Sequence, residues 1–121
     1  MEDRKATIAH LKTIVKIFCE ERDWDQFHGP KDLAIGIVTE AAELLDHFRF
    51  KSELEARKYL GNPKKRLEVE NEVADTLFMI LRLAQKYDID LSKALKRKIA
   101  QNHKKYPVKK AKGSNKKYNE L

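Results

Sequence analysis

The chain has 121 residues, of which 41% are hydrophobic and 37% charged, and its formal net charge at pH 7 is +7. This length fits one domain with a sizeable core. The single cysteine excludes an intrachain disulfide, and the sequence has neither an apolar run of about 18 residues nor the pattern of a signal peptide. We therefore expect a cytoplasmic protein without a membrane partner.

Apolar residues at steps of three and four predict a first helix over about residues 4–22. An aromatic-rich loop follows, from Arg22 to Pro30, and it contains Trp24, the only tryptophan. Two interpretations of Trp24 stay open. It caps the core of the helices, or it is a wall against which a flat base stacks.

The next predicted helix, from about Lys31 to Lys51, carries two carboxylates within its apolar stripe. Glu40 and Glu43 lie three residues apart, so the helical period places them on one face, about 60° apart. A carboxylate this close to the core is costly to desolvate unless a cation or a hydrogen-bond donor meets it. The apolar stripe consists of Leu33, Ile37, Ala41, Leu44, Leu45 and Phe48.

A short helix is predicted after Ser52, which begins a capping-box pattern. Asn62 and Pro63 then mark the cap and first position of a long helix that runs to about Tyr87.

This long helix repeats the three-residue spacing with Glu72 and Asp75. Two such pairs on facing helices would gather four carboxylates around one point. Like charges there need a hard divalent cation, and ligands that are all oxygen select Mg²⁺ or Mn²⁺ over zinc.

The main rival for such a cluster is a di-iron site, which requires Glu-x-x-His on two helices. His47 follows Glu43 by four residues instead of three, and Ala100 stands three residues before His103. The rival is therefore weak, and we interpret His47 as a partly buried helix residue.

A last helix is predicted from the cap Asp90 to about Lys105, and Pro107 ends it. We expect residues 1–107 to form the domain and residues 108–121 a basic, loosely ordered tail. From residue 93 onward the chain has eleven Lys or Arg and one acid, a net charge of +10.

The basic last helix has two interpretations. Lys98 and Asn102 share a face, with Tyr106 one turn on, which suits the binding of phosphate oxygens near a metal. Alternatively, the helix is a solvated basic face, or the chain is a basic helical module that binds nucleic acid or protein without catalysis.

Four motifs in this order resemble those of the MazG-like all-α nucleotide pyrophosphohydrolases, and within them the dCTP pyrophosphatase branch. They are Arg22-Asp-Trp-x-Gln-Phe-His28, Glu40-x-x-Glu43, Glu72-x-x-Asp75 and Lys98-x-x-x-Asn102-x-x-Lys-Tyr-Pro107. The likeness extends from about Leu11 to Leu121.

The resemblance implies a four-helix-bundle-type fold assembled through oligomerisation, as a tetramer of two dimers with sites near subunit interfaces. It implies Mg²⁺-dependent cleavage of a nucleoside triphosphate, dCTP or a 5-modified dCTP, to monophosphate and pyrophosphate, as in nucleotide pool sanitation. Nucleic acid is not an expected partner. The implied metal-binding and catalytic residues are Glu40, Glu43, Glu72 and Asp75, with Trp24 beside the base and Lys98, Asn102 and Tyr106 near the phosphates.

Two departures from the family pattern concern the base. Phe50 stands where close relatives tend to have a second tryptophan, and Val15 where some dCTP-cleaving relatives place a histidine. We expect Trp24 and Phe50 to sandwich the base, and His28 or Asn102 to hydrogen-bond its edge.

Overall fold

The computed structural model describes residues 1–121, which form helices joined by turns and contain no strand. The prediction of an all-α protein is confirmed. The chain divides into two compact units, Met1–Asp88 and Ile89–Leu121. None of the helices combines the length and the apolar character needed to cross a membrane.

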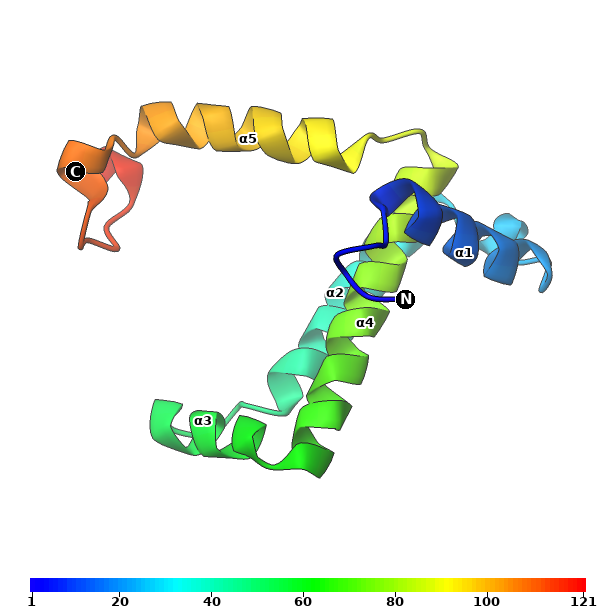
Figure 1. Cartoon of the computed structure of the whole chain (residues 1–121), viewed down its shortest axis with the longest axis horizontal. Coiled ribbons are helices and arrows are strands. Elements are labelled where there is room, and N and C mark those ends of the chain that lie inside the picture. The colour runs from blue at the N-terminus through cyan, green and yellow to red at the C-terminus, as the bar shows by residue number, and fades with distance from the viewer. The chain divides into compact units, whose positions relative to one another are not determined.

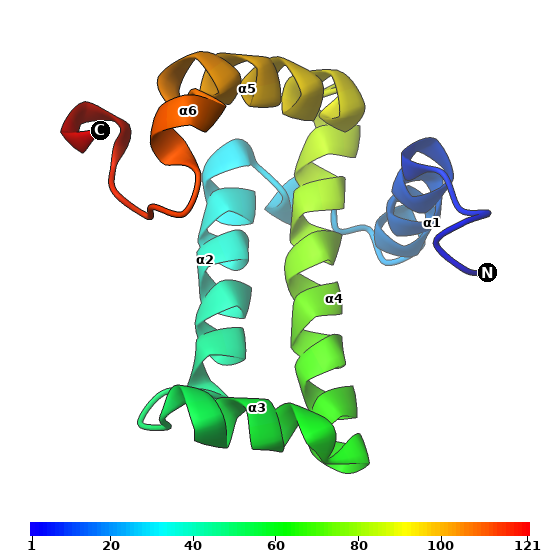
Figure 2. The ribbon, with the colours of Figure 1, turned by 60° about the vertical axis from the view of Figure 1, so that its left-hand side comes forward.

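The first unit is organised around two long helices, α2 and α4, which run side by side in opposite directions (Figures 1 and 2). Its elements are α1 (Ile8–Glu20), the 3₁₀ turn η1 (Asp25–Phe27), α2 (Pro30–Asp46), α3 (Glu53–Gly61) and α4 (Pro63–Lys86). Both α1 and α3 also pack on α4, and α3 crosses from the end of α2 to the start of α4 (Figure 2). The α2–α4 pair is therefore the scaffold of this unit.

The few buried apolar side chains come from α1, α2 and α4. They are Val15, Cys19, Leu33, Val69, Leu81 and Ala84. Part of the predicted stripe is left uncovered, since Leu45 is 59% exposed while Leu33 is 1% exposed. Other large apolar side chains exposed on the two long helices are Ile35, Val38, Leu67, Val73 and Leu77.

Side-chain caps begin three of the helices as the sequence predicts. Ser52 Oγ accepts a hydrogen bond from the backbone N–H of Glu55 at 3.2 Å. Asn62 Oδ1 accepts from two backbone N–H groups at 3.0 and 3.1 Å, and Asp90 Oδ1 accepts from one at 2.9 Å. These caps satisfy amide groups that have no partner within their own helix.

Two predicted helix boundaries are wrong. The first helix begins at Ile8 instead of residue 4, because the side chain of Thr7 caps it. The helix predicted to reach Lys51 ends at Asp46, and the chain turns through Phe50, whose φ is +66°. That left-handed conformation cannot continue a right-handed helix and is uncommon for a bulky residue.

The second unit comprises α5 (Leu91–Lys105), the short α6 (Val108–Ala111) and the 3₁₀ turn η2 (Tyr118–Glu120). The last two of these elements lie in the predicted basic tail, residues 108–121. The ring of Tyr118 packs edge-on against that of Tyr106, with centroids 6.1 Å apart, and Lys105 Nζ lies 4.9 Å from the Tyr118 ring centroid. The domain boundary at residue 107 stays a prediction.

Candidate active site

The facing surfaces of α2 and α4 bring four carboxylates together. Glu40 and Glu43 come from α2 and Glu72 and Asp75 from α4, and one carboxylate oxygen of each lies within 4.8 Å of the others. The i, i+3 spacing on each helix orients both members of a pair toward the same point. Packing of two antiparallel helices thus turns two short motifs into one acidic cluster.

Two oxygens of this cluster are buried without a hydrogen-bond partner, Glu40 Oε2 and Glu72 Oε2. Burial raises the pKa of Glu40 and of Glu72, and the nearby Glu43 carboxylate raises both further. Buried polar atoms are rarely left unpaired. An array of carboxylate oxygens with unpaired acceptors fits a hard divalent cation such as Mg²⁺ or Mn²⁺.

Close approach of the helices beside the cluster depends on Gly36, one turn before Glu40. A Cβ atom at Gly36 would meet Met79 Sδ at 3.0 Å and Met79 Cε at 3.1 Å. The missing side chain therefore lets α4 pack closely against α2 next to the carboxylates.

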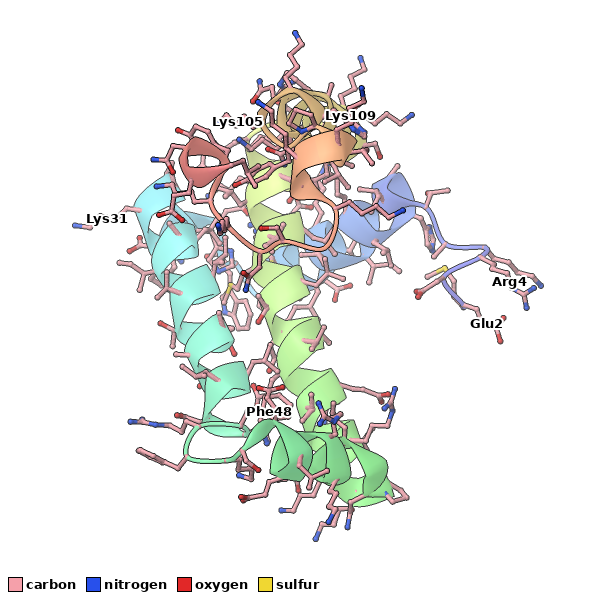
Figure 3. The ribbon with its side chains drawn as sticks, turned by 90° about the vertical axis from the view of Figure 1, so that its left-hand side faces the viewer. Glu2, Arg4, Lys31, Phe48, Lys105 and Lys109 are labelled. Atoms are coloured by element: carbon pink, nitrogen blue, oxygen red, sulfur yellow. The ribbon has the colours of Figure 1, made fainter.

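His47 also lies beside the cluster, which the sequence analysis did not anticipate. His47 Nε2 is 3.7 Å from Glu72 Oε1, and His47 Nδ1 is 2.8 Å from the hydroxyl of Tyr59 on α3. Phe48 lies at the same end of α2, next to α3 (Figure 3), and its ring centroid is 5.9 Å from that of Tyr59. The i, i+4 spacing from Glu43 was the available signal for placing His47 here.

A mainly apolar pocket of about 560 Å³ adjoins the carboxylates. Its lining residues are Ile14, Val15, Phe18, Trp24, Glu40, Asp75, Phe78 and Met79. Phe18 stands edge-on to both Trp24 and Phe78, with ring centroids 5.6 and 5.7 Å apart. An aromatic wall next to an acidic cluster suits a ligand that has a flat ring at one end and phosphates at the other.

Comparison with known proteins agrees with this geometry. The sequence matches the model of the MazG-like family over residues 35–121. The chain belongs to the MazG-like family. It is similar to dCTP pyrophosphatase 1 of Rattus norvegicus, with 35% identity, and of Homo sapiens, with 33% identity; each match spans 115 residues, 95% of this chain and 68% of the relative.

The fold is similar as well. A crystal structure of a pyrophosphatase from Archaeoglobus fulgidus superposes with a TM-score of 0.79 and 35% sequence identity, covering 88% of this chain and 98% of the other. Sequence and structure therefore place this MazG-like chain among proteins named as pyrophosphatases.

Within one chain of this MazG-like protein, Phe50 cannot sandwich a base against Trp24. Trp24 precedes α2 and Phe50 follows it, and a 17-residue helix is about 25 Å long. Phe50 is 92% exposed, and the guanidinium of Arg49 lies 4.5 Å from its ring centroid. The two rings are therefore held apart within a single chain, and a sandwich of the base between them stays a prediction that requires a second chain.

His28 lies beside Trp24, with ring centroids 6.0 Å apart, and does not line the pocket. Its Nδ1 accepts a hydrogen bond from Arg82 Nε at 2.9 Å. Burial lowers the pKa of His28, and the positive charge of Arg82 lowers it further. Sequence reasoning missed Arg82, because its partners His28 and Asp25 are 54 and 57 positions away in the chain.

The predicted phosphate-binding residues belong to the second unit. Asn102 and Tyr106 line a shallow pocket of about 230 Å³, and Tyr106 N–H donates to the backbone oxygen of Asn102 at 2.8 Å. Lys98 is exposed. A role for these side chains at the substrate phosphates stays a prediction.

The acidic cluster predicts that the metal-free protein loses stability as pH rises. The pKa values of Glu40 and Glu72 are raised above the ordinary 4.5, so the folded state binds more protons than the unfolded state. Their stabilising contribution is fully present below pH 4.5 and is lost as pH rises through the raised pKa values. Glu40→Gln should weaken this loss of stability with rising pH and raise Tm at neutral pH. Thermal unfolding in the presence of a chelator measures both effects.

The matched control is Glu68→Gln, because Glu68 is a partly exposed acid outside the cluster whose Oε2 lies 3.6 Å from Lys65 Nζ. This variant should keep the wild-type dependence of Tm on pH. Identical pH dependence in the wild type and in Glu40→Gln would contradict the assignment of crowded, partly buried carboxylates.

Proposed function

We propose that this chain is a divalent-metal-dependent nucleoside triphosphate pyrophosphohydrolase that takes dCTP or a 5-modified dCTP to the monophosphate and pyrophosphate. Membership of the MazG-like family, similarity to dCTP pyrophosphatase 1 and the pyrophosphatase fold support the reaction class. The observation that carries the proposal is the cluster of four carboxylates directly beside an aromatic pocket.

The residues proposed to hold the metal are Glu40, Glu43, Glu72 and Asp75, and we propose Mg²⁺, with Mn²⁺ as a substitute. The buried, unpaired oxygens of Glu40 and Glu72 support this choice, because both point to a missing cationic partner. A bound divalent cation supplies charge neutralisation for the triphosphate and acidifies water. His47, which contacts Glu72, holds that carboxylate in place.

The reaction is a displacement at phosphorus. Water attacks a phosphorus of the α–β bridge in line, the bond to the bridging oxygen breaks, and pyrophosphate separates from the monophosphate. The chain's contribution is positioning and electrostatic stabilisation. One carboxylate of the cluster accepts the proton of the attacking water, and Lys98 and Asn102 bind phosphate oxygens as charge and hydrogen-bond donor.

The base end of the site is the apolar pocket. Stacking on an aromatic ring contributes about 1–3 kcal/mol per base and discriminates poorly between bases. Val15 makes this part of the pocket apolar, and the polar groups among the lining side chains are the carboxylates of Glu40 and Asp75 and the indole N–H of Trp24. Such a dry wall favours a substituent at the 5-position of a pyrimidine.

The active form is proposed to be a tetramer of two dimers. The exposed apolar side chains on α2 and α4, among them Val38, Leu45 and Val73, support burial of these faces between chains. Phe50 can reach a base pocket only from a second chain, since within its own chain α2 separates it from Trp24.

Product analysis tests the reaction. With Mg²⁺, chromatography should show the monophosphate and pyrophosphate as the products of a deoxynucleoside triphosphate. Glu40→Gln, Glu43→Gln, Glu72→Gln and Asp75→Asn should each lower kcat/KM about 100-fold or more, because loss of an outer-shell partner of a metal ligand alone costs about 10–100-fold.

Controls for this series are Glu68→Gln and Glu70→Gln. Glu68 is partly exposed and Glu70 exposed, and they form ion pairs with Lys65 and Arg66 on the same helix. Both variants should retain wild-type activity. Release of orthophosphate and the diphosphate, or no turnover of any nucleotide, would refute the proposed reaction. Salt-dependent binding to generic DNA without turnover would favour a nucleic-acid-binding module.

Substrate choice is tested by kcat/KM across the canonical nucleotides and 5-substituted dCTP. We expect pyrimidine deoxynucleotides to be preferred, and Phe50→Trp to reduce the preference for 5-substituted bases because the larger ring fills the pocket. A purine triphosphate as the best substrate would overturn the substrate assignment and leave the reaction class standing.

Light scattering tests the assembly. The protein should be a tetramer at micromolar concentration, and Val38→Asp should dissociate it, because a charge on a buried apolar face is costly to desolvate. A stable monomer with full activity would contradict the proposed assembly.

A further inference from the structure

Arg82 is the only charged side chain that is buried, with 1% exposure. Each arm of its guanidinium has a partner: Nε donates to His28 Nδ1 at 2.9 Å, one terminal nitrogen donates to Gln85 Oε1 at 2.7 Å, and the other pairs with Asp25 Oδ1. The pKa of Asp25 is lowered, first of all by its hydrogen bond from Arg82. A buried guanidinium needs such complete pairing because desolvation of an unpaired charge is costly.

Neighbours of Arg82 hold the backbone of the same loop. Lys86 Nζ donates to the backbone oxygens of Asp25, at 2.5 Å, and of His28, at 2.9 Å. Tyr87 donates its hydroxyl hydrogen to the same oxygen of His28 at 3.0 Å. The end of α4 therefore fixes residues 25–28 through both side chains and main chain.

The loop has little regular structure of its own with which to hold this shape. It contains the three-residue turn η1, and it enters that turn through Asp23, whose φ is +53°. A left-handed residue without glycine's freedom costs conformational energy and persists where the surroundings determine it. Asp23 is held by Gln26, whose Nε2 donates to the backbone oxygen of Asp23 at 3.1 Å and to its Oδ2 at 3.2 Å. The side chains at the end of α4 hold Asp25 and His28, which flank Gln26 in the sequence.

Trp24 sits between the left-handed residue and the fixed segment. Its backbone N–H donates to the oxygen of Cys19 at 3.0 Å, and its side chain, 36% exposed, lines the pocket. The position of the indole therefore depends on the loop.

The order of residues along α4 connects this loop with the acidic cluster and the pocket. Asp75 lies at the acidic cluster, Phe78 and Met79 line the pocket, and Arg82 follows Phe78 by one helical turn. One rigid helix thus presents carboxylates, a pocket wall and an anchor for the opposite wall.

We propose that Arg82 and Asp25 are positioning residues: with Lys86 they clamp the loop so that the Trp24 indole is already placed to stack on a nucleobase. The base-stacking role rests on the proposed function. A fixed wall spares the ordering cost that a mobile loop would add on binding. The clamp therefore acts on affinity for the base and leaves the reacting phosphates untouched.

The test separates positioning from stability with two single variants and one double variant. Asp25→Ala leaves the buried guanidinium unpaired and should lower Tm as well as loosen the loop. Asp25→Ala with Arg82→Met removes the unpaired charge, so it should recover stability without restoring the clamp. Lys86→Met, a half-buried site, loosens the loop without touching the ion pair.

Fluorescence of Trp24, the only tryptophan, reports on the mobility and exposure of the loop without any nucleotide. All three variants should show lower anisotropy and stronger quenching by acrylamide than the wild type. KM for the nucleotide should rise about tenfold, equivalent to about 1.4 kcal/mol. Inhibition by inorganic triphosphate, which has no base to stack, should stay within about twofold, and so should kcat.

Arg66→Gln is the matched control, because Arg66 forms an exposed ion pair with Glu70 on the same helix, at 3.4 Å. It should leave Trp24 fluorescence and KM unchanged. A double variant that is folded, with wild-type Trp24 quenching or wild-type KM, would overturn the proposal. Absence of nucleotide turnover in the wild type would refute the proposed function instead, and Trp24 quenching would still report on the clamp.

Discussion

The structure depends on repulsion between carboxylates that is maintained where α2 and α4 pack together. Four carboxylates converge there, and two of their oxygens are buried without a partner. Hydrophobic packing of the two helices holds these groups together against their repulsion. Gly36 permits the close contact with Met79 on one side, while His47 lies next to Glu72 on the other. The scaffold therefore maintains an arrangement whose negative charge a bound cation would neutralise.

The long helix α4 arranges the parts of the site in sequence. From Asp75 to Arg82 the helix advances about 10 Å, passing from carboxylates to pocket wall to loop anchor. On the proposed function, the triphosphate lies at the acidic end and the base extends toward Phe18 and Trp24. The reacting groups and the recognition groups are thus separated along one rigid element, so that base preference can vary without disturbing the acidic cluster.

Local signals in the sequence were sufficient for much of the fold. Caps at Ser52, Asn62 and Asp90 begin helices as predicted, because a side chain that bonds to its own helix needs no distant partner. The pairing of Glu40 with Glu72 also followed from spacing on two apolar helices. The early end of α2 did not follow from the sequence. The left-handed residue beyond it is Phe50, whereas glycine or asparagine is the usual sign of that conformation.

Non-local contacts were beyond the reach of the sequence pattern. Arg82 is an ordinary surface residue by type, and it is buried because Asp25, 57 positions away, meets it. Phe50 was placed beside Trp24 on the family pattern, yet the length of α2 separates them within one chain. In both cases spacing along the chain says nothing about which distant segment supplies the partner.

The central claim is that the carboxylates of α2 and α4 form one divalent-metal site. Titration with Mn²⁺, followed by the electron paramagnetic resonance signal of the free ion, tests it without any nucleotide. The wild type should remove free Mn²⁺ from solution, and Glu68→Gln should do the same. A variant with both Glu40→Gln and Glu72→Gln should leave the ion free. Equal Mn²⁺ binding by the wild type and this double variant would contradict the account.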